Sequence, residues 1–174
     1  MKQKIYTLDK LSRVLNKEGK RKKKIVLCHG VFDLLHVGHI KHFKEAKKYG
    51  DLLVITITPD NYVNKGPNRP AFPSQLRLES IAALEIVDYV AENKWPTAIK
   101  TIHTLKPDVY CKGPEYRNHE EDITGKIMEE EKAVLSHGGK MEYTDDITFS
   151  SSNLLNEFGN IFNDNQKLLI DKIN

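Results

Sequence analysis

Two histidines, His36 and His39, are the residues whose type and spacing point most directly to chemistry. They end the string Gly-Val-Phe-Asp-Leu-Leu-His-Val-Gly-His. If a helix begins near Val37, residues three apart share a face of its first turn, and Gly38 removes a side chain where a phosphate could approach. Two imidazoles can donate hydrogen bonds to a polyphosphate, and any protonated fraction adds positive charge. The pair therefore predicts a phosphate-binding turn.

The segments on either side of this turn fit the prediction. An apolar run at residues 24–29 is typical of a buried strand, and residues 40–49 have the pattern of a helix that Gly50 closes. Such strand-to-helix turns hold phosphates in α/β proteins, because backbone N–H groups and the positive end of the helix dipole point at the ligand. We expect three residues of the turn to contact a nucleotide: Gly30, Val31 and Phe32.

Helical and strand patterns alternate along the rest of the chain. Helical spacing covers residues 7–17, 73–85, 96–105 and about 124–137, with further helices from 153 and over 160–173, whereas strand patterns cover 51–58, 86–91, 108–111 and 140–144. This alternation predicts an α/β fold, a Rossmann-like parallel sheet of about five strands flanked by helices. We expect one domain over residues 1–158, followed by a C-terminal helical extension over 159–174 that could link to a further domain.

The composition narrows the classes of function. The 174 residues suffice for one domain with a sizeable core. A net charge of +3 argues against nucleic-acid binding, and we interpret the basic run at 20–24 as a solvated approach to the first strand. No segment has the length of a membrane span or the pattern of a signal peptide. Cys28 and Cys111 lack metal-site spacing and predict buried thiols in the reducing cytoplasm.

The turn resembles the signature of the cytidylyltransferase-like nucleotidyltransferase superfamily, whose motif is His-x-Gly-His. The resemblance implies that a phosphate or phosphonate of a second substrate attacks the α-phosphate of a nucleoside triphosphate. Pyrophosphate then leaves, and no covalent enzyme intermediate forms. Class I aminoacyl-tRNA synthetases have a related motif, but they are much longer and carry a second, lysine-rich signature that this sequence lacks.

The same resemblance implies further site residues. It makes His36, His39 and Lys65 the catalytic groups, and it places Arg69 on the substrate. Arg77 is either a phosphate ligand or a structural anchor. The remaining implied residues bind nucleotide or phosphate, with one substrate-binding tyrosine among them: Lys112, Gly113, Tyr116, Ser150, Ser151 and Ser152. Pro114 stands where similar proteins have a second glycine, and it removes one backbone N–H donor from that turn.

Over about residues 24–158 the sequence is most similar to the nucleotidyltransferase domain of bifunctional heptose-phosphate synthases, which are adenylyltransferases joined to a sugar kinase. The resemblance implies a sugar phosphate acceptor, a nucleotide-sugar product, a homo-oligomer, and a sugar kinase fused to the chain or separate from it. It also implies Mg²⁺, for which Asp33 and Asp60 are the nearest carboxylates.

Three alternatives stay open from the sequence. The nucleotide is ATP or CTP, because backbone groups are expected to recognise the base. The acceptor could be an alcohol phosphate, although Asp145-Asp146-Ile147-Thr148 stands where the glycerol-phosphate type has an arginine. The chain could also bind nucleotides without reacting them.

Overall fold

A single parallel sheet of six strands forms the centre of the molecule. The computed structural model describes residues 3–16, 23–65, 69–117 and 126–145. The strands are β1 (Ile5–Tyr6), β2 (Ile25–Gly30), β3 (Leu52–Ile57), β4 (Tyr89–Glu92), β5 (Val109–Lys112) and β6 (Lys140–Tyr143), in the order β1-β4-β3-β2-β5-β6. All five strand pairings are parallel.

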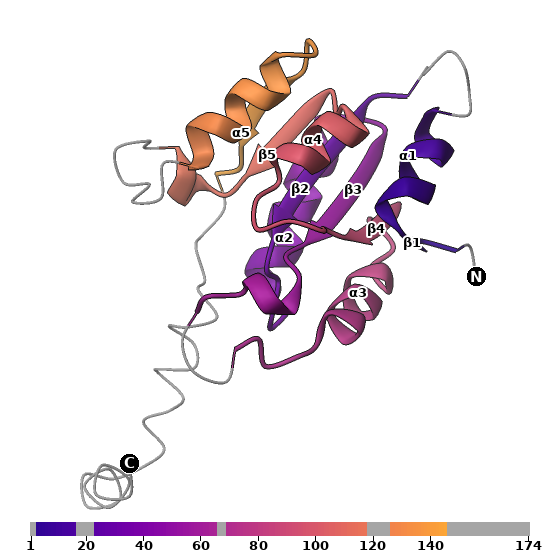
Figure 1. The fold of residues 1–174 in the computed structure, drawn as a ribbon, viewed down its shortest axis with the longest axis vertical. Coiled ribbons are helices and arrows are strands. Elements are labelled where there is room, and N and C mark those ends of the chain that lie inside the picture. Colours follow the sequence, from indigo (N-terminus) through magenta and orange to yellow (C-terminus); the bar gives the residue numbers. More distant parts are fainter. Residues whose placement is uncertain (1–2, 17–22, 66–68, 118–125, 146–174) are drawn as a thin grey trace, which may run out of the picture.

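Helices cover both faces of this sheet (Figure 1). They are α1 (Leu8–Asn16), α2 (Val37–Lys47), α3 (Ser74–Ala82), α4 (Ile99–Leu105) and α5 (Lys126–Leu135), with short 3-10 turns η1 (Asp60–Tyr62) and η2 (Pro114–Tyr116). Leu27 packs with α1, α4 and α5, whereas its neighbours Val26 and Cys28 pack with α2 and α3. Each inner strand is therefore buried on both sides, which explains its nearly continuous apolar sequence.

The α/β class and the parallel sheet predicted from the sequence are confirmed, but the sheet has one more strand than expected. The additional strand, β1, contains only Ile5 and Tyr6, which pair with Val90 and Ala91 of β4. Two residues are too few for an alternating pattern to be recognised. The helices expected from 153 and over 160–173, and the domain boundary at 158, lie outside the described residues.

The topology brings the predicted site segments to one edge. Strand β2 lies between β3 and β5, and the chain crosses from one side of β2 to the other between β4 and β5. Ligands bind beyond the carboxyl ends of parallel strands at such a reversal of strand order. Gly30, Ile57 and Lys112 are the last residues of these three strands, so the segments that follow them converge there.

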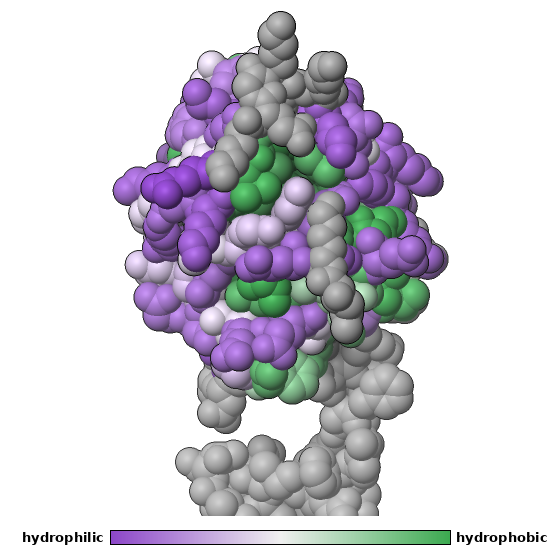
Figure 2. All heavy atoms as spheres, turned by 90° about the vertical axis from the view of Figure 1, so that its right-hand side faces the viewer, coloured by the Kyte–Doolittle hydropathy of each residue, from purple (hydrophilic) through white to green (hydrophobic). Residues whose placement is uncertain are grey.

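The face that holds α1 and the β1 edge is mainly hydrophilic, and its hydrophobic side chains form small separate groups (Figure 2). Among the described residues, no helix combines the length and apolar character needed to cross a bilayer. The described side chains visible in this view thus form no extended apolar area of the kind that marks a large docking site.

Candidate active site

The two histidines of the motif cap helix α2. His36 is the N-cap residue, with extended backbone angles, and its Nδ1 accepts a hydrogen bond of 3.1 Å from the backbone N–H of Gly38. The His36 backbone N–H donates in turn to Nδ1 of His39, at 3.4 Å. This reciprocal arrangement is a capping box in which imidazoles take the places usually held by a hydroxyl and a carboxamide or carboxylate. The helix begins at Val37, so both rings lie at its first turn.

An aromatic stack fixes the orientation of the two rings. The centroids of His36 and His39 lie 3.8 Å apart with an interplanar angle of 30°. Phe32 meets His39 edge to face at 5.2 Å and Phe43 at 5.1 Å. Phe32 adopts a φ of +48°, and a Cβ on Gly30 would lie only 3.0 Å from its ring. Gly30 and Phe32 therefore shape the turn by packing, and a side chain at position 30 would displace the ring behind His39.

The hydrogen bonds define which imidazole nitrogen is free to act. Because Nδ1 of each ring accepts from a backbone N–H, the neutral ring carries its proton on Nε2. Burial lowers the pKa of His39 to about 3, and the charges of His36, His42 and Lys65 act in the same direction. Burial, followed by the charge of Lys65, also lowers the pKa of His36. Both rings are neutral at pH 7, so the expected contribution of protonated histidine does not apply without a ligand.

One donor in this arrangement has no partner. Nε2 of His36 is buried and makes no hydrogen bond within the described part of the chain. A buried N–H without a partner costs free energy, and such groups are rare unless a ligand or water completes them. His39 differs, because it also bonds the backbone of Leu34. Lys65 is exposed, yet its charge reaches both rings. The three predicted catalytic residues thus lie near one another, with one N–H donor open.

Asp33 fixes the loop that follows β3. Its buried carboxylate accepts hydrogen bonds from Nη1 of Arg69 at 2.8 Å and from the backbone N–H groups of Ala71 and Phe72 at 2.9 and 3.0 Å. These bonds, with the Arg69 charge, hold the pKa of the Asp33 carboxyl below its usual value even though burial acts to raise it. Arg69, expected on the substrate, therefore has one guanidinium nitrogen committed to Asp33.

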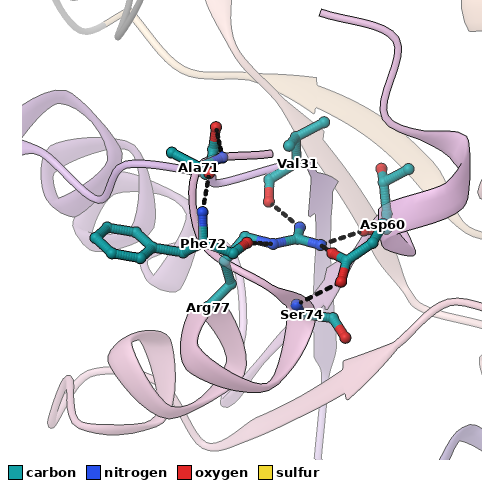
Figure 3. A network of polar contacts seen from close by, with 8 residues as sticks. Val31, Asp60, Ala71, Phe72, Ser74 and Arg77 are labelled. Atoms are coloured by element: carbon teal, nitrogen blue, oxygen red, sulfur yellow. Dashed lines mark hydrogen bonds and ion pairs between the residues drawn. The ribbon is translucent and has the colours of Figure 1, made fainter. Parts of the chain in front are cut away.

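Arg77 anchors three segments from inside the protein (Figure 3). Its side chain is only 1% exposed. The guanidinium donates to the carbonyls of Phe72 at 3.0 Å, Val31 at 2.6 Å and Thr58 at 2.9 Å, and to Oδ1 of Asp60 at 2.5 Å. Of the two roles that the sequence left open for Arg77, this geometry supports the structural anchor. Val31 contributes a carbonyl to the same network, so it positions the turn.

Lys112 is half of a buried ion pair. The lysine and Glu130 of α5 are 8% and 5% exposed, and Lys112 Nζ lies 3.4 Å from Glu130 Oε2. The ammonium also stands 4.2 Å from the centroid of the Tyr116 ring. The predicted phosphate ligand Lys112 and the predicted substrate residue Tyr116 are therefore in contact. Gly113 precedes η2 with a φ of −69°, which any residue can adopt.

Sequence reasoning missed Glu130, and a signal for it was present. In α5 the buried positions are Ile127, Glu130, Ala133 and Val134, an i, i+3, i+6, i+7 series that marks one face of a helix. A glutamate in such a series is unusual unless it has partners inside the protein. Its carboxylate accepts from Tyr110 Oη at 2.8 Å and from the backbone N–H of Ala98 at 3.2 Å.

His29, whose sequence context indicated no role, bridges two hydroxyls at the same edge of the sheet. Its Nδ1 lies 3.0 Å from Thr56 Oγ1 and its Nε2 lies 3.3 Å from Thr58 Oγ1. Burial lowers the pKa of His29 to about 4, and the charge of Lys112 acts in the same direction while that of Glu130 opposes it. His29 is therefore a neutral structural bridge at pH 7.

We expect His29→Gln to weaken the dependence of stability on acid. The folded protein keeps this ring neutral down to about pH 4, whereas the unfolded chain protonates it near pH 6.5. Unfolded chains therefore bind more protons in that interval, and the unfolding free energy falls as the pH falls. The unfolding free energy is measured by urea denaturation at several pH values. Near pH 5 it should change less steeply with pH in the variant than in the wild type, by about 1 kcal/mol per pH unit. The same substitution at exposed His103 is the control, and equal slopes for His29→Gln and wild type would contradict this account.

The carboxylates near the site do not fit a magnesium ion. Both oxygens of Asp33 accept hydrogen bonds, as described above. Asp60 Oδ1 accepts from Arg77, and its Oδ2 accepts from the backbone N–H of Ser74 at 3.0 Å. No group of three or more metal-ligating side chains occurs among the residues that the structure describes. Asp33 and Asp60 therefore hold the fold of the surrounding loops.

The predicted serine-rich segment, Ser150, Ser151 and Ser152, lies outside the described residues. The last described residues before it in the sequence follow β6 and bond to side chains of α2. Thr144 Oγ1 lies 3.0 Å from His42 Nδ1, and the Asp145 N–H lies 3.1 Å from Glu45 Oε2. The Gly38 backbone N–H, which could have approached a phosphate, is instead used by the His36 ring.

Comparison with known proteins supports a family assignment. The family model described as cytidylyltransferase-like matches residues 27–156. A curated protein of Geobacter metallireducens, named Bifunctional protein HldE, is 42% identical over 141 residues, which are 80% of this chain and 27% of that protein. The protein of the same name from Campylobacter fetus is 36% identical over 88% of this chain and 31% of its own length. The chain thus spans less than a third of these relatives.

Solved structures show the same fold. A lipopolysaccharide core biosynthesis protein from Thermoplasma volcanium superposes with a TM-score of 0.59 at 30% identity, covering 72% of this chain and 99% of that one. Pantoate-beta-alanine ligase from Francisella tularensis superposes with a TM-score of 0.58 at 17% identity, covering 87% of this chain and 69% of that one. The second likeness concerns the fold alone.

Proposed function

The chain belongs to the cytidylyltransferase-like family, and from this premise we propose that it is a nucleotidyltransferase. It transfers a nucleoside monophosphate from ATP or CTP to a sugar phosphate or a similar phosphorylated acceptor. The observation that carries the proposal is the buried, unpartnered Nε2 of His36 beside the stacked ring of His39, at the N-terminus of the helix after the central strand. A triphosphate oxygen is the partner that this N–H donor would receive in a helix-start anion site.

In the proposed reaction an oxygen of the acceptor phosphate forms a bond to the α-phosphorus. The bond from the α-phosphorus to the oxygen that bridges to the β-phosphate breaks, and pyrophosphate leaves with the electron pair. The protein supplies position and charge stabilisation, since no covalent intermediate is needed. His36 Nε2–H donates to a phosphate oxygen, and His39 holds the His36 ring in place by stacking and capping. Lys65 and Lys112 offset the negative charge that builds on the departing pyrophosphate.

The proposal of a sugar phosphate as the acceptor is based on the related proteins. The Thermoplasma volcanium protein is a lipopolysaccharide core biosynthesis protein, and a nucleotide sugar is the activated form in which sugars are built into such polymers. The curated relatives are named bifunctional, and the chain covers 27% of the first. Both points support a second activity beside the transferase in those proteins, and a sugar kinase as partner, fused or separate, stays a prediction. Mg²⁺ would arrive with the triphosphate, and a homo-oligomer in the cytoplasm stays a prediction.

Two measurements on the purified chain test the proposal. Thermal unfolding is recorded with ATP or CTP and Mg²⁺, since a ligand that binds only the folded state raises the unfolding temperature. Pyrophosphate release is then followed with the stabilising nucleotide and a panel of sugar 1-phosphates, with glycerol 3-phosphate as the alcohol phosphate. We expect one nucleotide to stabilise clearly more than the other and a sugar phosphate to release pyrophosphate.

The possible outcomes separate the alternatives. Release with glycerol 3-phosphate alone would identify a transferase for alcohol phosphates. Stabilisation by a nucleotide without release for any acceptor would favour a binding module, and the enzyme assignment would then be wrong. If neither nucleotide raises the unfolding temperature and no pyrophosphate is released, the proposed nucleotide binding is wrong.

A further inference from the structure

Lys112 is confined at the carboxyl edge of the sheet by groups from several elements. Its backbone carbonyl accepts hydrogen bonds from the N–H of Thr144 at 3.0 Å and from Thr144 Oγ1 at 3.5 Å. Its ammonium lies over the Tyr116 ring at 4.2 Å and 5.6 Å from the centroid of the Tyr110 ring. The main chain of Lys112 is thus held by Thr144, and its ammonium lies near two aromatic rings and depends on a charged partner for its position.

That partner is Glu130, and it is itself rigidly held. Tyr110 Oη donates to Oε2 and the Ala98 backbone N–H donates to Oε1. These two bonds use one oxygen each and leave the carboxylate little freedom to rotate. The distance from Lys112 Nζ to Oε2 is 3.4 Å, longer than the roughly 2.8 Å of a direct charged hydrogen bond. The carboxylate therefore attracts the ammonium by charge without a short hydrogen bond to it, so the N–H groups of Lys112 can still donate to a ligand.

We propose that Glu130 is a positioning residue for the transfer reaction, which keeps the Lys112 ammonium directed to the phosphates of the bound substrates. The inference rests on the proposed function. In this proposal Glu130 does not contact a substrate. From its place in α5 it acts on the substrate phosphates only through the position of the Lys112 ammonium. A buried ammonium needs a compensating charge, and Glu130 provides it from α5, which packs on the opposite face of the sheet from α2.

A double-mutant cycle tests this coupling. Glu130→Gln removes the charge but retains a side chain of the same shape, and Lys112→Met removes the group through which Glu130 acts. We expect Glu130→Gln to lower kcat/KM for the nucleotide about tenfold when Lys112 is present, and less than about twofold in the Lys112→Met background. Glu129→Gln, the same change at the exposed neighbouring position of α5, is the matched control and should leave kcat/KM unchanged.

A purely structural glutamate would behave differently. Its loss would lower activity by the same factor with and without Lys112, and that result would overturn the inference while the proposed function stands. If the wild-type chain neither binds nor turns over a nucleoside triphosphate, the proposed function fails and the inference fails with it. Should Glu130→Gln not fold, Tyr110→Phe removes one hydrogen bond from Oε2 and keeps the charge. Its smaller loss of kcat/KM must likewise disappear in the Lys112→Met background, or the inference is wrong.

Discussion

His36→Asn should lose about two to three orders of magnitude in kcat while remaining as stable as the wild type. Asparagine is among the best N-cap residues, so its Oδ1 can replace the Nδ1 that accepts from Gly38. What the variant lacks is the Nε2–H donor, which lies buried and unpartnered. The rate of pyrophosphate release reports the loss of this donor, and the thermal unfolding temperature reports any loss of the cap, so the two measurements together separate the two effects.

Two further variants complete this experiment. His36→Ala removes both the cap and the donor, so it should show the same kinetic loss and a decrease of about 1 kcal/mol in the unfolding free energy. His103→Asn repeats the chemical change on an exposed histidine of α4 and should change neither quantity. If His36→Asn turns over at the wild-type rate, the histidine serves only as a cap and the proposed catalytic role is wrong.

Arg77→Met should have the largest effect on stability, about 3–5 kcal/mol of unfolding free energy, because each buried carbonyl left without a donor costs about 1–3 kcal/mol. The substitution removes the donor of three carbonyls around a buried position. It also removes the partner of the Asp60 carboxylate, whose side chain is 42% exposed and adds less. Because Val31 and Phe72 belong to the motif turn and the following loop, activity should fall as well. Arg77→Lys keeps the charge, yet a single ammonium cannot reproduce the planar fork of donors. We expect it to recover less than half of the loss.

Equilibrium denaturation in urea measures this effect, and Arg13→Met on the exposed face of α1 provides the control. The structural role would be contradicted by an Arg77→Met variant that keeps wild-type stability but binds nucleotide weakly. That pattern is expected of an arginine that contacts phosphate, the other role that the sequence left open.

Local patterns were sufficient to predict much of the fold. The central strands are buried on both faces, so continuous apolar runs identified β2 and β3 to within about two residues. The helical pattern at residues 40–49 identified most of α2, and its start at Val37 was considered from the spacing of the two histidines, whereas their role as the capping residues was not predicted. Strand β1 was missed because its pairing with β4 depends on tertiary contacts and its two residues carry no periodicity.

The site was less predictable, because several of its side chains have partners far away in the sequence. The carboxylate of Asp33, named from the sequence as one of the two nearest to the expected Mg²⁺, bonds Ala71 and Phe72, nearly forty residues later. Arg77 was recognised as a site-associated arginine, but only the folded chain shows that backbone carbonyls surround it. Glu130 could have been found from its place on the buried face of α5, although its pairing with Lys112 requires the sheet topology.

The central claim, that Nε2 of His36 meets the triphosphate, is tested most directly by nitrogen NMR of the imidazoles. The protein is labelled with ¹⁵N at histidine and titrated with the nonhydrolysable α,β-methylene analogue of the stabilising nucleotide, and His36→Asn is used to assign the signal. The account predicts that the His36 Nε2–H resonance shifts in a saturable way while the ring keeps its Nε2–H tautomer. Saturable binding of the analogue with the His36 signal unmoved would contradict it.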